Sequence, residues 1–186
     1  MGTVHRELVN LSDEVWVRTR ARLDGLSDDE YFWEPAAHCW TIRRARDGRW
    51  HADSSSSPPD PAPFTTVAWR LWHLIDMYGE DRAPQWLDVP PQGEAVGLDG
   101  PDDPPGSAGE ALRRLDRAHD RWDAHLALVD DDVLAQPIGP VAGPYAEASR
   151  AGYVLHMLDE FIHHAAEIAT LRDLWRVQHP ADSTTQ

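Results

Sequence analysis

The chain has 186 residues, with 17 basic and 32 acidic side chains and a formal net charge of −15 at pH 7. This length favours one domain over residues 1–186, and the acidic balance argues against nucleic-acid or anionic-membrane partners, which bind Lys and Arg. The sequence has no run of 18 apolar residues, no signal-peptide core and one cysteine, Cys39, so we expect a cytoplasmic protein without internal disulfides.

The first helix is predicted over residues 3–24. One face of it repeats at three- and four-residue spacing, as in an amphipathic helix, with Leu8, Leu11, Val15, Thr19 and Leu23. Ser27 and Glu30 form a possible capping box for a short second segment that ends before Pro35. Residues 34–63 are rich in Pro and Ser and are expected to be irregular, with a small hairpin between residues 40–43 and 49–51 as the alternative.

The second long helix is predicted over residues 66–83, with Thr65 or Thr66 as its cap and Pro84 as its end. One apolar stripe on it consists of Val67, Leu71, Leu74, Ile75 and Tyr78. A second row at i, i+4 and i+8 consists of Trp69, His73 and Met77. A helix that is apolar on two sides is buried on two sides, which suits the interior of a bundle.

The third helix follows a long loop over residues 84–105 and runs from a capping box at Ser107 to about Val129. It carries a heptad seam in which His119 points inward, either as a pocket-lining proton carrier or as a hydrogen-bonded core residue. A second loop over residues 130–145 leads to the fourth helix, at about 147–176. The sequence therefore predicts an all-α four-helix bundle with long irregular loops.

Imidazoles and carboxylates cluster within three turns of the fourth helix. They are His156, Glu160, His163, His164 and Glu167. Residues four apart share a helix face, so Glu160 and His164 have the spacing of two metal ligands on one helix. His73 is the candidate third ligand, and three protein ligands with an open position are typical of a catalytic metal site.

Other readings of these residues stay open. A lone inward His is commonly a hydrogen-bonded core residue, and Glu160 could instead pair with Arg172. His156 and His163 could be ligands, orienting groups or solvated residues. On the second helix, Asp76 and Glu80 could accept the other ring proton of His73. Elsewhere, the indoles that could wall a substrate pocket belong to Trp40, Trp50 and Trp69, and Cys39 is expected to be a small packing residue.

Three stretches resemble the DinB/YfiT-like superfamily. They are LSDDEYFWEP at 26–35, TTVAWRLWHL at 65–74 and DEFIHHAAEI at 159–168. The resemblance implies a homodimeric four-helix bundle that binds a divalent metal, commonly Zn²⁺ or Ni²⁺. Many members of the superfamily use three His ligands. Those that resemble mycothiol-dependent maleylpyruvate isomerase use His/Glu/His, which His73, Glu160 and His164 match.

This resemblance implies a metal-dependent S-transferase or isomerase that activates a small thiol beside an electrophilic substrate. Mycothiol is the expected thiol because all 17 basic residues are Arg, a composition that indicates a GC-rich genome such as that of an actinobacterium. Arg70 and Arg82 are candidate thiol contacts, and His119 is a candidate catalytic group. The alternatives are a hydrolase that uses a metal-activated water and a non-catalytic bundle that binds a metal or small ligand.

Overall fold

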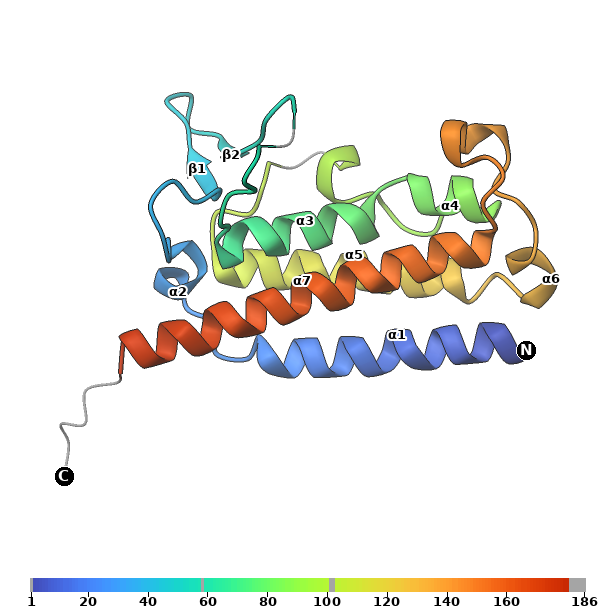
Figure 1. The fold of residues 1–186 in the computed structure, drawn as a ribbon, viewed down its shortest axis with the longest axis horizontal. Helices are drawn as coiled ribbons and strands as arrows, with labels where there is room; N and C mark the ends of the chain where they lie inside the picture. The colour runs from blue at the N-terminus through green and yellow to red at the C-terminus, as the bar shows by residue number, and fades with distance from the viewer. Residues whose placement is uncertain (1, 58, 101–102, 181–186) are drawn as a thin grey trace.

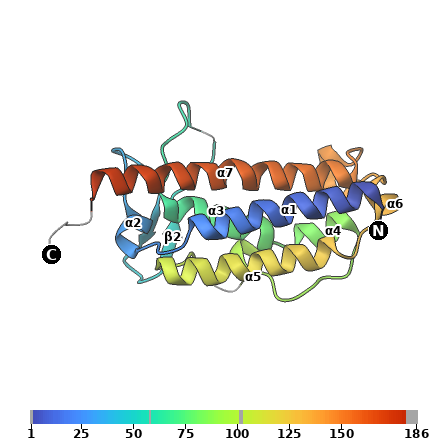
Figure 2. The same cartoon turned by 90° about the horizontal axis from the view of Figure 1, so that it is seen from below.

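The structure of the protein is a computed structural model that describes residues 2–57, 59–100 and 103–180. Its framework consists of four long helices, α1 (Thr3–Arg22), α3 (Val67–Gly79), α5 (Ala108–Leu126) and α7 (Arg150–Gln178) (Figure 1). Helix α3 contacts both α5 and α7, and α1 contacts α7. Seen from below in Figure 2, α1 lies between α7 and α5. The predicted all-α four-helix bundle is confirmed.

The long helices do not simply alternate in direction. Helices α1 and α7 run one way, and α3 and α5 run the opposite way (Figure 1). Because α3 and α5 are parallel neighbours, the chain between them must return along the full length of the bundle. The described residues of this return are 80–100 and 103–107, and the return is the physical reason that the second and third long helices are so far apart in the sequence.

Shorter elements occupy the connections. They are α2 (Asp28–Phe32), β1 (Ile42–Arg44), β2 (Trp50–Ala52), α4 (Arg82–Leu87), η1 (Gly97–Asp99), α6 (Asp131–Leu134) and η2 (Pro140–Tyr145). Strands β1 and β2 pair antiparallel with Arg43 opposite His51, so the hairpin alternative is confirmed. The prediction that residues 84–105 and 130–145 are loops throughout is wrong, since each contains short helical turns.

Helix α3 ends earlier than predicted, and Pro84 does not end it. Gly79 is its last residue, and Glu80 has an extended backbone with φ −70° and ψ 164°. A Cβ on Gly79 would lie 2.1 Å from Val96 Cγ2, so the returning chain passes against the helix end. Pro84 instead lies within α4. The predicted cap is confirmed at Thr66, whose hydroxyl accepts a hydrogen bond from Trp69 N at 3.2 Å.

The core lies between the four helices and contains a stack of aromatic rings. Tyr78 is sandwiched between Trp122 and Phe161, with ring centroids 5.0 and 4.8 Å away. In α1, Leu11 is 37% exposed, so the prediction that it shares the buried face of the helix is wrong. The neighbouring Ser12 is buried instead and accepts a hydrogen bond from the Trp122 indole.

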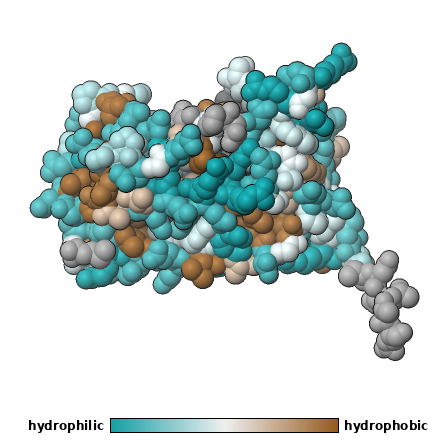
Figure 3. All heavy atoms as spheres, turned by 180° about the vertical axis from the view of Figure 1, so that it is seen from behind, coloured by the Kyte–Doolittle hydropathy of each residue, from teal (hydrophilic) through white to brown (hydrophobic). Residues whose placement is uncertain are grey.

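The face of the molecule opposite to the view of Figure 1 is largely hydrophilic. In the view from behind, hydrophilic side chains predominate and apolar side chains form separate areas (Figure 3). Within the described part of the chain, none of the helices combines the length and the apolar character that crossing a bilayer requires.

Candidate metal centre

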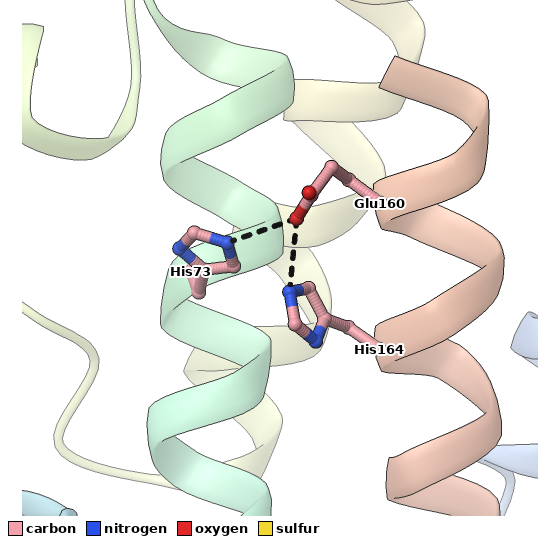
Figure 4. Close-up of side chains that lie close together, drawn as sticks. All are labelled: His73, Glu160 and His164. Carbon is pink, nitrogen blue, oxygen red and sulfur yellow. Dashed lines mark hydrogen bonds and ion pairs between the residues drawn. The ribbon is translucent and has the colours of Figure 1, made fainter. Parts of the chain in front are cut away.

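Helices α3 and α7 bring three of the predicted side chains to one point. Glu160 and His164, one turn apart on α7, extend toward α3, where Nε2 of His73 faces the Glu160 carboxylate (Figure 4). Glu160 Oε2 lies 3.8 Å from His73 Nε2 and 3.2 Å from His164 Nε2. One ligand atom from each residue lies within 4.8 Å of the other two. The structure therefore brings together the predicted ligand set from two helices.

The donor atoms fit a divalent ion. Two ligand atoms about 2.0–2.2 Å from a tetrahedral Zn²⁺ lie about 3.3–3.6 Å apart, close to the two separations around Glu160. Two imidazoles and one carboxylate are donors that Zn²⁺ and Ni²⁺ accept. Because burial lowers the pKa of His73 to about 4, its imidazole is neutral at pH 7, which is the form that binds metals.

His73 is held by its neighbours as well as by its backbone. Its ring stacks on the indole of Trp69, with centroids 5.5 Å apart and planes 16° apart. The His164 ring stands at 82° to it, with a centroid distance of 4.7 Å. Besides burial, the adjacent His164 also lowers the pKa of His73, whereas the Glu160 carboxylate opposes this shift. The ring is therefore oriented toward Glu160 while remaining uncharged.

The second nitrogen of His164 faces a carboxylate that the sequence analysis did not assign. His164 Nδ1 lies 2.8 Å from Glu167 Oε2, a separation that requires Nδ1 to carry the hydrogen and donate it. Arg70 Nη1 is farther from the same nitrogen, at 3.2 Å. With Nδ1 protonated, Nε2 presents its lone pair toward Glu160, as a metal ligand must.

Glu167 is in turn held by Arg70. The Arg70 Nε lies 2.8 Å from Glu167 Oε2, and Nη2 donates to Oε1 at 3.1 Å. Carboxylates that orient a metal-binding His in this way are common around metal centres. The i, i+3 spacing of His164 and Glu167 is a signal that could have identified the pair, because such residues share a helix face.

A second grouping of potential ligands shares His164 and consists of His163, His164 and Glu167. His163 Nε2 lies 3.3 Å from Glu167 Oε1, but the His163 side chain is 63% exposed. This grouping comes from a single helix, and its use would withdraw Glu167 from Arg70. We therefore favour the His73 grouping, whose ligands come from two facing helices.

The other candidate residues lie elsewhere or have other contacts. His156 is exposed and lines a separate pocket with Arg82, whose guanidinium pairs with Glu80 at 2.9 Å. His119 is buried in α5 and stacks on Trp16 at 3.8 Å, which places it in the contact between α1 and α5. Asp76 Oδ1 accepts a hydrogen bond from Leu98 N at 2.6 Å.

The remaining open readings concern Glu160, Arg172, Cys39 and the tryptophans. Arg172 pairs with Glu30 at 2.8 Å, not with Glu160. Cys39 is buried and donates to Ala36 O, in keeping with a packing role.

A pocket of about 500 Å³ lies beside His73. Two of the three predicted tryptophans, Trp50 and Trp69, line this pocket. Trp40 is not part of the lining and packs on Trp69, with ring centroids 5.6 Å apart. The returning segment between α3 and α5 supplies another wall, which includes Leu98 and Asp103. The candidate metal centre therefore adjoins a pocket large enough for a small organic molecule.

The fold and this centre define a helical-bundle protein with a candidate His/Glu/His metal site. A model of the family described as the DinB superfamily matches residues 12–168. The chain therefore belongs to the DinB superfamily, and this membership supports metal binding by the cluster.

Two further comparisons bear on this chain. A solved structure described as the conserved protein of locus from Enterococcus faecalis has a similar fold, with a TM-score of 0.57 and 13% identity. The similarity covers 94% of this chain and 98% of that one, and at this identity it concerns the fold alone. No curated protein matches the chain.

Proposed function

We propose that this protein is a divalent-metal-dependent enzyme in which His73, Glu160 and His164 hold the ion and a small thiol is a cosubstrate. The observation that carries the proposal is the convergence of three ligand atoms within 4.8 Å of one another, beside a pocket. A bound divalent ion supplies Lewis acidity, which lowers the pKa of a thiol or water in its open position.

The residues around the ion would hold and orient it. Glu167 keeps the hydrogen of His164 on Nδ1, and Arg70 holds Glu167 in place. Glu160 contributes one negative charge and the two imidazoles none, so a divalent ion in this centre keeps a net charge of +1 that one thiolate would neutralise. Because Arg70 is engaged by Glu167, we assign it to the metal centre and not to thiol binding.

We further propose that the reaction is an S-transfer or a thiol-dependent isomerisation and that mycothiol is the thiol. The support is the similarity of the His/Glu/His set to that of mycothiol-using members, together with a composition typical of GC-rich genomes. Arg82 is not included among the thiol contacts, because it lies on a separate pocket with His156 and Trp86.

Metal analysis and calorimetry test the proposal in two stages. Purified protein should contain one Zn²⁺ or Ni²⁺ per chain. The metal-loaded protein should then bind mycothiol more tightly than glutathione, and chelation should abolish the heat. A metal-loaded protein that binds neither thiol would overturn the thiol proposal and leave a hydrolase or a non-catalytic binding protein. A protein that takes up no metal would overturn the proposal entirely.

The homodimer and the single domain over residues 1–186 stay predictions. Light scattering at tens of micromolar decides the first, with twice the chain mass expected. Limited proteolysis decides the second, since a single domain should resist cleavage between the long helices.

A further inference from the structure

We infer that the pocket beside His73 takes an uncharged aromatic molecule, which would be the electrophilic substrate. This inference rests on the proposed function for the role of the molecule but not for its binding. The pocket is formed by strand β2 and the segment around η1, which lie on the same side of α3 (Figure 1). Its walls and its charges each indicate the class of ligand.

The walls of the pocket are flat indoles in fixed orientations. The Trp69 indole Nε1 donates to Asp53 O at 2.8 Å, and its ring lies nearly parallel to His73. Trp50 stacks on Phe32 with planes 13° apart and centroids 5.4 Å apart. Trp72 is a third indole in the lining and is buried. Planar aromatic walls favour planar aromatic ligands, which bury a large apolar area in offset-stacked or edge-to-face contacts.

The charges in the lining do not favour an anion. Among the described residues that line the pocket, the charged side chains are one guanidinium, Arg49, and three carboxylates, Asp53, Asp76 and Asp103, with a formal charge of −2. The Arg49 guanidinium is already paired, because its Nε donates to Asp103 at 2.9 Å. A carboxylate or phosphate ligand would therefore meet net negative charge, and pairing with Arg49 would require displacing Asp103.

The carboxylates also have hydrogen-bond and ion-pair partners within the protein, so the pocket does not offer a simple cation site. Asp53 Oδ2 accepts from Thr41 N at 3.0 Å and lies 3.2 Å from Arg43 Nε. Asp103 Oδ2 accepts from Trp50 N at 3.3 Å, which ties the returning segment to the hairpin. Because these polar groups hold the walls together, the surface that they leave for a ligand is mainly apolar and includes three indoles, and an uncharged ring fits it best.

The pocket is preformed on the side of α3. Gly97 has φ +84°, and a Cβ there would lie 2.5 Å from Asp76 Cα, so the returning chain touches the helix directly. The next residue, Leu98, donates from N to Asp76 at 2.6 Å. A wall fixed by backbone contact loses little conformational entropy when a ligand binds.

A matched ligand pair tests the inference. 2-Naphthylmethanol and 2-naphthoate share one ring system and differ in charge. We expect the metal-free protein to bind the alcohol about tenfold or more tightly than the carboxylate in ligand-observed NMR titrations, because the lining repels an anion. The protein as purified is titrated alongside, since a bound metal would attract the carboxylate. Equal or tighter binding of the carboxylate by the metal-free protein would overturn the inference, as would no binding of either ligand.

Two arginine variants test whether 2-naphthoate and 2-naphthylmethanol bind in this pocket. Ser54 lies on the pocket and is exposed, so Ser54→Arg adds a cation at the rim with little risk to folding. We expect it to strengthen 2-naphthoate binding about threefold or more and to leave the alcohol within about twofold. Ser56→Arg is the matched control, because Ser56 is exposed and is not part of the pocket lining. An equal gain in both variants would show general attraction and contradict binding in this pocket.

A third variant tests the aromatic wall. Trp50→Leu should weaken binding of the alcohol about tenfold, because the ligand loses a flat indole face. Circular dichroism and the unfolding midpoint confirm that the variant is folded, and unchanged alcohol binding by folded protein would overturn the placement. These titrations need neither metal nor thiol. They can therefore fail while metal and thiol binding succeed, and the reverse outcome is equally distinct.

Discussion

Helix α7 carries two polar clusters that differ in how donors meet acceptors. Near its C-terminal end, Arg172 and Glu30 are 2% and 5% exposed and form two hydrogen bonds of 2.8 and 3.0 Å. The same guanidinium also donates to the carbonyl oxygens of Arg22 and Asp24. Every contact in this cluster joins a donor to an acceptor, so the cluster is complete without a ligand.

The second cluster consists of Glu160 and His164, two turns earlier on α7, together with His73 from α3. Its centre has a different pattern of donors and acceptors. The Nε2 atoms of His73 and His164 converge on the same Glu160 oxygen. When both imidazoles are neutral and present Nε2 lone pairs, the three residues direct lone pairs at one point, and a divalent cation there satisfies them together. Burial and charge therefore do not by themselves mark a ligand site. The balance of donors and acceptors does mark such a site. It predicts that mutations in the first cluster lower stability, whereas mutations in the second lower metal affinity.

Mutating the Arg172–Glu30 cluster should have the largest effect on stability. Arg172→Ala leaves the Glu30 carboxylate buried without its partner, so we expect a loss of about 3–5 kcal/mol in the free energy of unfolding. Urea denaturation measures it. The matched control is Arg176→Ala on the same helix, where the pair with Asp173 is exposed and the loss should be about 0–1 kcal/mol. Metal content per folded chain should not change in either variant.

Mutating the cluster of His73, Glu160 and His164 should instead affect metal binding. His73→Ala or His164→Ala removes one of three ligands, and we expect zinc affinity to fall about 100-fold or more, beyond the usual effect of an outer-shell change. Competition with a chromogenic chelator measures the affinity. His163→Ala is the control and should retain most of the affinity. A metal content that both alanine variants leave unchanged would remove the basis of the assignment.

Replacing Glu167, which orients His164, should have an intermediate effect on zinc affinity. Glu167→Gln keeps the size of the side chain but removes its charge, so its hold on both His164 and Arg70 weakens. We expect a loss of about 10-fold to 100-fold in zinc affinity, with little change in metal-free stability. Asp159→Asn on the exposed side of the same helix is the control. If the Gln variant binds zinc as tightly as the parent, Glu167 has no orienting role.

The smallest predicted effect is the response of the metal-free protein to acid. The pKa of His73 is about 4 in the folded protein, against an ordinary value of 6.5, so between these values the unfolded chain binds a proton that the folded chain does not. Stability therefore falls as the pH is lowered from about 6.5 to 4. Since His73 is 33% exposed, solvent screening limits its share to about 1–2 kcal/mol.

Urea denaturation of metal-free protein at pH 7 and pH 4.5 measures this response. His73→Gln cannot take up the proton, so its loss of stability on acidification should be smaller than that of the parent. Equal losses in the two proteins would show that His73 does not carry this pH dependence.

Local periodicity determined much of this protein. The predicted bundle, the Thr66 cap and the shared face of Glu160 and His164 all follow from the 3.6-residue repeat, which acts within a few turns of one helix. His73 was also identified from a local pattern, as the polar member of an otherwise apolar row. These features needed no knowledge of how the helices meet.

Only the tertiary structure decided which distant groups meet. Three features join segments far apart in the sequence: the parallel arrangement of α3 and α5, the wall that residues 97–100 and 103–104 form beside α3, and the pairing of Arg172 with Glu30. Arg70 and Glu167 likewise come from different helices. One-dimensional patterns predict which face of a helix is buried, but partner choice depends on the packing of all four helices at once. For that reason the ligand pair on α7 could be predicted from the sequence, whereas the hold of Arg70 on Glu167 and the position of the pocket beside His73 could not.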